Sequence, residues 1–224
     1  MVKLINATPS PWGRKVRILL IEKGLDVEVV NDIPWAPDTC VPQYNPLEKL
    51  PILIADDGES VYESRLIVEW VERYFPEPAM IPSDNAGYLA CKKAEVLADG
   101  IMDAGLLFFM EGHRESQDAA WSARQGRKLV GGVAEVARMI GTRPFAVGDR
   151  FTLADAAIGA MLGSLEFIPT MTDRVDQEVQ WRQQHPNLGD YFDRLEERPS
   201  FAATRPVMFD FDVAQSMQHE SVDG

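Results

Sequence analysis

Two serines in the first third of the chain stand where helices are expected to begin, and a helix start can bind an anion. Ser10 precedes Pro11, a pairing that is typical of a helix cap followed by the first helical residue. The first turn of a helix has unpaired backbone N–H groups and the positive end of the helix dipole. A thiolate bound there is stabilised, and the Ser10 hydroxyl can add a hydrogen bond. From its own residues, however, the site is more simply explained as a helix cap.

The second serine, Ser64, follows Glu63 at the start of another expected helix, residues 65–75. We expect Ser64 to cap that helix, which by itself explains a serine at this position. The same helix start can bind a carboxylate through the Ser64 hydroxyl and the nearby N–H groups, while Glu63 pairs with an ammonium group. An acid beside a cap therefore fits a ligand that carries both charges.

A proline opens the apolar segment at residues 50–54. Because proline has no N–H to donate, Pro51 belongs at the first residue of a strand or on a sheet edge. Most X–Pro bonds are trans, so the residues alone indicate an ordinary strand start after Leu50.

Three acids in the second half, Glu95, Asp99 and Asp103, are four residues apart and share one face of a helix. The favoured interpretation is a solvated acidic stripe. We predict no metal site, because the three histidines of the chain lie elsewhere without the paired spacing of metal ligands.

Composition narrows the class of protein. The chain has 224 residues and a formal net charge of -13, which argues against nucleic acid as a partner. Apolar residues make up 46%, enough for a substantial core. No 18 apolar residues run together, so we expect no membrane partner. The chain has two cysteines, which suits a reducing compartment, and we expect a cytoplasmic protein.

The first 80 residues alternate between strands and helices. Strands are predicted over residues 2–6, 27–30, 50–54 and 60–62, and helices over residues 14–23 and 65–75. The proline-rich stretch between Pro34 and Pro46 is predicted to be a loop, or at most one short helix. The order β-α-β, loop, β-β-α implies a parallel pair followed by an antiparallel hairpin.

Strand patterns then disappear. Helices are predicted over residues 86–113, 118–140, 153–167 and 188–197, and the tail after residue 206 is left unassigned. Thr152 and Asp155 form a capping-box pattern, which we interpret as purely structural. Four glycines inside these helices favour close helix–helix approach: Gly100, Gly105, Gly131 and Gly132. We expect one domain over residues 1–78 and an all-helical one over residues 85–205, with 206–224 as tail.

Four motifs occur along the chain in an order and at separations that are typical of a known family. They are Ser10-Pro11 before the first helix, Leu50-Pro51 after residues 45–49, Glu63-Ser64 before the second helix, and residues 148–155 before an apolar helix. Together they resemble the cytosolic glutathione S-transferase family, from residue 2 to about residue 201. The amino-acid sequence of residues 10–17 and 98–104 resembles the bacterial YibF-like branch of this family. The resemblance implies an α/β thioredoxin-like domain followed by an all-α helical bundle domain.

The resemblance also implies roles for the motif residues. Glutathione would be the co-substrate, with Ser10 at its thiol and Thr8 as the alternative donor. A cis bond before Pro51 would expose the backbone of Leu50 to pair with the peptide. Glu63 and Ser64 would hold the γ-glutamyl end of glutathione. A homodimer is expected, in which Asp99 or Asp103 can approach the glutathione of the partner subunit.

The second substrate implied is a small electrophilic or hydrophobic molecule. Aromatic candidates for its pocket are Trp12, Trp35, Phe108, Phe109 and Trp121. We expect a transferase that activates the glutathione thiol. Serine cannot form the mixed disulfide of cysteine-based relatives, and Cys40 lies away from the helix start in the sequence. The alternatives are a glutathione-dependent reductase, isomerase or dehalogenase, or a non-enzymatic interaction protein on the same fold, as in stringent-starvation and elongation-factor proteins.

Overall fold

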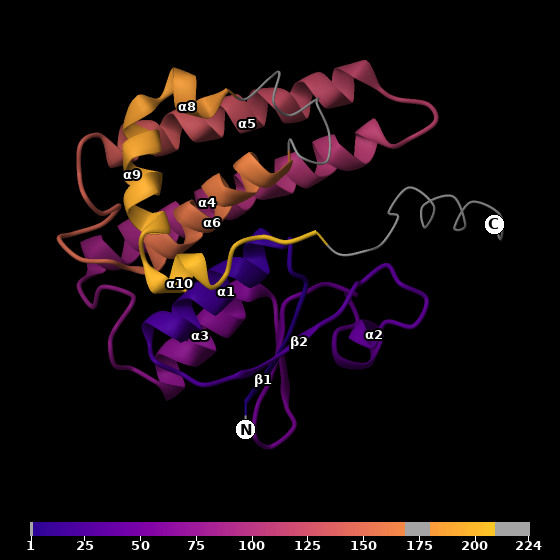
Figure 1. Ribbon diagram of the computed structural model, residues 1–224, viewed down its shortest axis with the longest axis vertical. Helices are drawn as coiled ribbons and strands as arrows, with labels where there is room; N and C mark the ends of the chain where they lie inside the picture. Colours follow the sequence, from indigo (N-terminus) through magenta and orange to yellow (C-terminus); the bar gives the residue numbers. More distant parts are fainter. Residues whose placement is uncertain (1, 169–179, 209–224) are drawn as a thin grey trace.

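The first part of the chain forms a small mixed sheet flanked by helices (Figure 1). The computed structural model describes residues 2–168 and 180–208, so the unassigned tail lies outside the described residues from residue 209 onward. The strands are β1 (Lys3–Asn6), β2 (Glu28–Asn31), β3 (Ile52–Ile54) and β4 (Ser60–Tyr62), in the order β2-β1-β3-β4. The pair β1–β2 is parallel and the other two pairs are antiparallel, which confirms the predicted topology.

The helices of this part are α1 (Pro11–Glu22), the short α2 (Val41–Tyr44) inside the proline-rich stretch, and α3 (Ser64–Tyr74). Helix α1 begins at Pro11 with Ser10 as its cap, which confirms the predicted cap. This start is three residues before residue 14, where the predicted helix range began. Strand β3 begins at Ile52, two residues later than predicted, since Pro51 has no N–H for the ladder.

The remaining described elements are all helical: α4 (Asn85–Gly112), α5 (Ala119–Ile140), α6 (Leu153–Phe167), α8 (Trp181–Gln184), α9 (Pro186–Glu196) and α10 (Pro199–Ala202). The four long predicted helices are confirmed to within two residues at each end. No helix in the described ranges, 2–168 and 180–208, is long and apolar enough to cross a bilayer.

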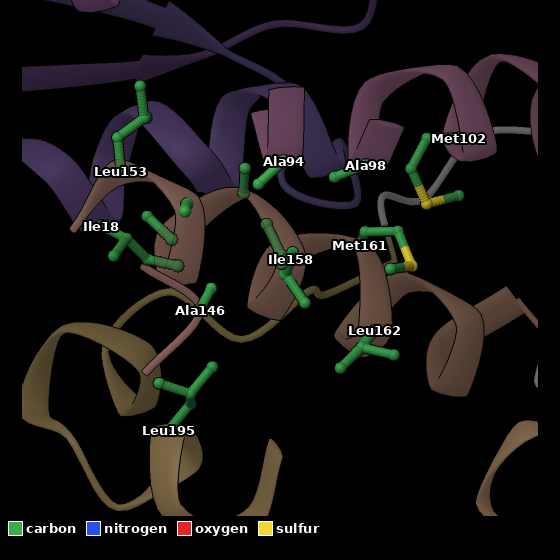
Figure 2. Packing of buried hydrophobic residues seen from close by; sticks show 14 of the residues in the cluster. Ile18, Ala94, Ala98, Met102, Ala146, Leu153, Ile158, Met161, Leu162 and Leu195 are labelled. Atoms are coloured by element: carbon green, nitrogen blue, oxygen red, sulfur yellow. The ribbon is translucent and has the colours of Figure 1, made fainter. Parts of the chain in front are cut away.

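One hydrophobic core joins the two parts. Helix α1 packs against α6, with the sheet on its other side (Figure 1). Figure 2 shows Ile18 of α1 beside Leu153 and Ile158 of α6, and all three are fully buried. This shared core holds the start of α1 in a fixed position relative to the helical part.

The predicted role of the helix glycines is confirmed for Gly132, where an added Cβ would lie 2.5 Å from Ile101 of α4. A Cβ at Gly105 would lie 3.2 Å from a methionine of its own helix. The prediction is wrong for Gly100 and Gly131, where nothing lies within 4 Å of an added Cβ. Their faces of α4 and α5 point outward, so no neighbouring helix requires a glycine there.

The capping box at the start of α6 is confirmed. The fully buried Asp155 carboxylate accepts hydrogen bonds from the Thr152 N–H at 2.8 Å and the Thr152 hydroxyl at 3.1 Å. It also accepts from the Ala146 N–H and the Tyr191 hydroxyl, both at 2.7 Å. Burial raises the pKa of Asp155, and these neutral donors only partly oppose the shift. This carboxylate therefore joins three segments of the helical part.

Candidate functional site

A cleft of about 610 Å³ separates the loops of the first part from helices α4 and α6. All five residues predicted from the motifs line it: Ser10, Leu50, Pro51, Glu63 and Ser64. These residues come from the β1–α1 turn, the loop before β3 and the β4–α3 turn. The fold therefore brings together side chains that are separated by up to 54 positions in the sequence.

Ser10 stands at the start of α1 with one hydrogen-bonding function still available. Its Oγ accepts a bond from the Gly13 N–H at 3.2 Å, as expected of a helix cap. A hydroxyl has one donor and two acceptor sites, so capping leaves the Ser10 proton to donate into the cleft. Thr8, the alternative donor, is not among the residues that line the cleft.

The turn at Glu63 and Ser64 differs from the prediction. Ser64 does not cap α3 but is its first residue, and Glu63 occupies the capping position without a side-chain capping bond. The Ser64 hydroxyl instead donates to Glu63 Oε1 at 3.1 Å. Glu63 has φ of 72°, a conformation that costs a residue with a side chain about 1–3 kcal/mol and is concentrated at functional sites. The turn thus presents an exposed carboxylate beside a buried hydroxyl.

The bond between Leu50 and Pro51 is cis, which confirms the prediction. The sequence reasoning missed the residue that shapes the loop before it. Asn45 is buried and lines the cleft, where its Nδ2 donates to the Lys49 carbonyl at 2.8 Å and its Oδ1 accepts from the Leu47 N–H at 2.9 Å. The sequence signal that could have revealed this loop is Asn45 directly before Pro46, because an asparagine followed by a proline favours a turn.

The acidic stripe of α4 is not solvated, so that interpretation is wrong for two of its three members. Glu95 is 0% and Asp99 5% exposed, and both surround the buried Lys15 of α1. Lys15 Nζ lies 3.0 Å from Glu95 Oε1 and 3.0 Å from both carboxylate oxygens of Asp99. The spacing of the acids could not reveal this, because their cation is 80 positions earlier in the sequence.

The stripe also reaches the cleft, which Asp99 and Asp103 both line within their own chain. Arg65 of α3, which lines the cleft as well, donates from Nε to Asp99 Oδ2 at 2.8 Å. Burial, followed by the negative charge of Asp99, raises the pKa of Asp103. The predicted approach of Asp99 or Asp103 to a partner's glutathione stays a prediction.

Only some of the aromatic residues predicted to line the second-substrate pocket line the cleft. Trp12, Trp35 and Phe109 line the cleft, whereas Phe108 is buried in the core and Trp121 lies on the surface away from it. The last two expectations were wrong because an aromatic side chain in a helix does not tell which side of the helix the cleft is on. Further apolar lining residues come from α4 and the end of α6: Met102, Leu106, Met110, Phe167 and Ile168.

Neither cysteine lines the cleft. The Cys40 thiol donates to Asp32 Oδ2 at 3.0 Å, and this bond raises its pKa. Burial raises the pKa of Cys91 to about 11. Both thiols are therefore held in the protonated form, which is a poor nucleophile.

Comparison with known proteins agrees with this arrangement. Residues 4–79 match the family model of the glutathione S-transferase N-terminal domain, and residues 119–194 match that of the C-terminal domain. The uncharacterized GST-like protein YibF of Escherichia coli is 36% identical over 209 residues, which cover 92% of this chain and 98% of that protein. A maleylacetoacetate isomerase of Pseudomonas aeruginosa is 29% identical, over 83% of this chain and 96% of that one.

Solved structures are similar over nearly the whole chain. A glutathione S-transferase of Methylobacterium radiotolerans in complex with glutathione sulfonate has 49% identity and a TM-score of 0.87, covering 95% of this chain and 99% of that one. A glutathione S-transferase of Methylobacillus flagellatus with glutathione bound has 38% identity and a TM-score of 0.86, covering 92% and 100%. The chain therefore belongs to the glutathione S-transferase family, in its bacterial YibF-like branch.

Proposed function

We propose that this protein is a glutathione transferase that activates the glutathione thiol at the start of α1 for attack on a small electrophile. The observation that carries the proposal is that Ser10, Leu50, Glu63 and Ser64 meet in one cleft. Two similar structures contain glutathione or its sulfonate, which supports glutathione as the ligand here. The other half of the cleft is apolar and suits an uncharged electrophile.

Glu63, Ser64 and Leu50 each have a function in binding the peptide. The Glu63 carboxylate pairs with the γ-glutamyl ammonium. The Ser64 hydroxyl turns its proton from Glu63 to the γ-glutamyl carboxylate, which the first N–H groups of α3 also hold. The backbone N–H and C=O of Leu50 pair with the cysteinyl residue as a neighbouring strand would. These contacts leave the sulfur beside Ser10.

Catalysis then depends on lowering the thiol pKa and on positioning the sulfur. A cysteine thiol ordinarily has a pKa of about 8.5. The dipole of α1, the unpaired N–H groups of its first turn and the Ser10 hydroxyl all stabilise the thiolate more than the thiol. The bound thiolate attacks the electrophilic carbon, the carbon–sulfur bond forms, and a leaving group such as halide departs.

Ser10→Ala tests the activation step. Loss of one charge-assisted hydrogen bond, about 1.5–3 kcal/mol, raises the pKa of the bound thiol by about one to two units. We expect slower conjugation of an aryl halide and a pH–rate profile that is shifted upward, with glutathione affinity nearly unchanged. Thr8→Ala is the matched control and should behave like the wild type. Superimposed profiles for Ser10→Ala and the wild type would reduce Ser10 to a helix cap.

Glu63→Ala tests the binding step. We expect glutathione affinity to fall by about 2–5 kcal/mol, the cost of truncating one partner of a charge pair that the ligand buries. Calorimetric titration measures this, with the exposed Glu59→Ala on the same hairpin as control. A dissociation constant equal to that of the wild type would remove Glu63 from the site.

A glutathione-dependent isomerase is the second candidate, favoured by the 29% identity to a maleylacetoacetate isomerase. The same cleft would serve, but glutathione would be regenerated instead of leaving in the product. Turnover of a cis-enone diacid without consumption of glutathione would favour this candidate over the transferase. A non-enzymatic interaction module would instead show no glutathione binding in the same titration at millimolar concentration.

We also propose a homodimer in which the sheet-containing part of one chain packs against the long helices of the other. Large apolar side chains are exposed on α3 and on α4, namely Leu66, Tyr74, Leu89 and Val96. A stable interface of about 1,600 Å² or more would cover them. Sedimentation at micromolar concentration tests this, and a single species of 25.1 kDa would contradict it.

A further inference from the structure

The two reactants of the proposed reaction would be held by different parts of the molecule. The residues that would bind glutathione, among them Ser10 and Glu63, belong to the sheet-containing part, and α1 begins at the thiol site. The helical wall of the apolar half is formed by α4 and by the end of α6, where Ser164 and Phe167 line the cleft. The sulfur and the electrophilic carbon are therefore aligned only if α1 and α6 keep a fixed relative position.

Arg14 joins the two parts one helical turn after the thiol site. Its backbone N–H donates to the Ser10 carbonyl at 2.9 Å, so Arg14 belongs to the first turn of α1. Its side chain is only 2% exposed and extends into the helical part. There Nη2 lies 2.5 Å from Glu196 Oε1 and donates to the Phe201 carbonyl at 3.3 Å, while Nε donates to the Thr204 hydroxyl at 3.5 Å. One buried side chain thus connects the first turn of α1 to α9, α10 and the segment after α10.

The same side chain also packs against α6, next to the cleft. A Cβ added at Gly163 would lie 1.9 Å from Arg14 Nη1, so the guanidinium occupies space that a glycine leaves open. Nη1 is buried and has no hydrogen-bond partner in the described part of the chain, so its contact with α6 is one of packing. Gly163 directly precedes Ser164, the first residue of α6 that lines the cleft. Arg14 therefore contacts the helix against which the electrophile would bind.

We propose that Arg14 is a positioning residue that aligns the glutathione sulfur with an electrophile held against α6. The inference rests on the proposed function. Arg14 does not line the cleft, so it acts through the first turn of α1 and not on a ligand. The residues that would bind glutathione all belong to the sheet-containing part. Loss of the Arg14 contacts should therefore leave glutathione affinity and the thiol pKa unchanged, while the geometry of attack on the electrophile worsens.

The opposing explanation is that Arg14 only stabilises the fold. Removing Arg14 alone would leave the Glu196 carboxylate without its buried partner, which destabilises a protein whatever the function of the pair. The variant Arg14→Leu/Glu196→Gln removes the cation and its counter-ion together. Rates are compared per folded molecule, well below the unfolding transition measured by circular dichroism. A purely structural role lowers the Tm and leaves these rates equal to those of the wild type.

Two electrophiles separate alignment from thiol activation. The first is 1-chloro-2,4-dinitrobenzene, and the second is iodoacetamide, which has little apolar surface for the α6 wall to hold. At saturating glutathione we expect kcat/KM for the aryl halide to fall about 10- to 100-fold in Arg14→Leu/Glu196→Gln, the effect of a small misplacement of reacting atoms. The rate with iodoacetamide, the pH–rate profile and the dissociation constant of glutathione should equal those of the wild type.

The matched control is Arg17→Met. Arg17 is on the same helix and donates to the Ala203 carbonyl at 3.0 Å, so it also joins α1 to the C-terminal segment, but without a contact beside the cleft. Its replacement should leave the rates with both electrophiles unchanged.

Gly163→Ala is a second variant that removes neither charge. Its Cβ displaces the Arg14 guanidinium from α6, so kcat/KM for the aryl halide should again fall while glutathione affinity stays the same. Leucine at position 14 ends three bonds short of the position of Nη1 and leaves room for that Cβ. Adding Gly163→Ala to Arg14→Leu/Glu196→Gln should therefore cause no further loss, because the two changes break the same contact. If the charge-pair variant does not fold, Gly163→Ala by itself gives the test with both electrophiles.

The outcomes separate this inference from the proposed function. A loss confined to the aryl halide supports the positioning role of Arg14. Wild-type rates per folded molecule in the variants overturn that role and leave the transferase proposal intact. An equal loss with both electrophiles, or a shifted pH–rate profile, also overturns it, because Arg14 would then act on the thiol. Absence of glutathione binding or of conjugation in the wild type overturns both proposals.

Discussion

Two of the places where the protein buries carboxylates balance the negative charge in different ways. Between α1 and α4, Glu95 and Asp99 surround the ammonium group of Lys15. At the start of α6, Asp155 meets neutral donors, among them the Tyr191 hydroxyl. Both sites are on helices, and the carboxylates of both are buried.

The presence or absence of a nearby cation sets the direction in which each carboxyl pKa is shifted. Burial by itself would raise the pKa of Glu95, but Lys15 and Lys92 outweigh burial and lower it below its ordinary value. Burial raises the pKa of Asp155, since its neutral donors stabilise the charge less than a cation would. Only the first site reaches the cleft, through Asp99 and its bond to Arg65. A charged cluster therefore links the fold to the cleft, while the capping box serves the fold alone.

The largest effect is expected from removing the buried cation. Lys15→Met leaves two carboxylates facing each other, and breaking a buried charge pair in this way costs about 3–5 kcal/mol of unfolding free energy. Glutathione affinity should fall as well, because Asp99 loses one of the two cations that hold it. Urea unfolding measures the stability, with the exposed Lys93→Met of α4 as control. A loss below about 1 kcal/mol would show that the cluster does not need its cation.

Asp155→Ala should destabilise the protein by about 3 kcal/mol, because it leaves buried donors of Ala146 and Tyr191 unpaired and removes the helix cap. Glutathione affinity, measured where the variant is folded, should be that of the wild type. Asp149→Ala, an exposed acid of the same loop, is the control. A changed glutathione affinity would contradict the conclusion that the capping box serves only the fold.

The pH dependence of stability should change in opposite directions at the two sites. The lowered pKa of Glu95 means that its contribution is present above its ordinary value of 4.5 and is lost as the pH falls. Glu95→Gln should therefore lose less stability than the wild type on acidification.

The contribution of Asp155 to stability changes with pH in the opposite direction. Its raised pKa means that the folded protein binds its proton more tightly, so this contribution declines as the pH rises above 3.8. Asp155→Asn should therefore lose more stability on acidification than the wild type does. Urea unfolding between about pH 3.5 and 6 measures both slopes. Slopes that change in the same direction would contradict the role assigned to the cation.

The smallest change in stability is expected for Arg65→Ala. Arg65 is half-exposed, and exposed ion pairs contribute about 0–1 kcal/mol. Its removal should alter glutathione affinity more than unfolding free energy, and Arg73→Ala on the exposed side of α3 is the control. A loss of stability as large as that of Lys15→Met would mean that Arg65, and not Lys15, balances the charge of Asp99.

Local chemistry within the sequence determines where most elements of this protein begin. The serine before Pro11 marks a helix start, Pro51 marks a strand start, and the capping box of Thr152 and Asp155 marks the start of α6. Such signals act over about four residues, so the sequence contains them completely. The order of strands and helices could be predicted for this reason. Which residues meet in the cleft was implied only by the resemblance to the glutathione S-transferase family that the motifs carry.

Tertiary structure alone decided which faces are buried and by what. The spacing of Glu95 and Asp99 places them on one side of α4, but only the packing of α1 brings Lys15 to that side. The same holds for the cleft itself, whose helical wall depends on how α6 meets α1 and α4. Burial depends on partners that are distant in the chain, and a helical period predicts a face without naming what covers it.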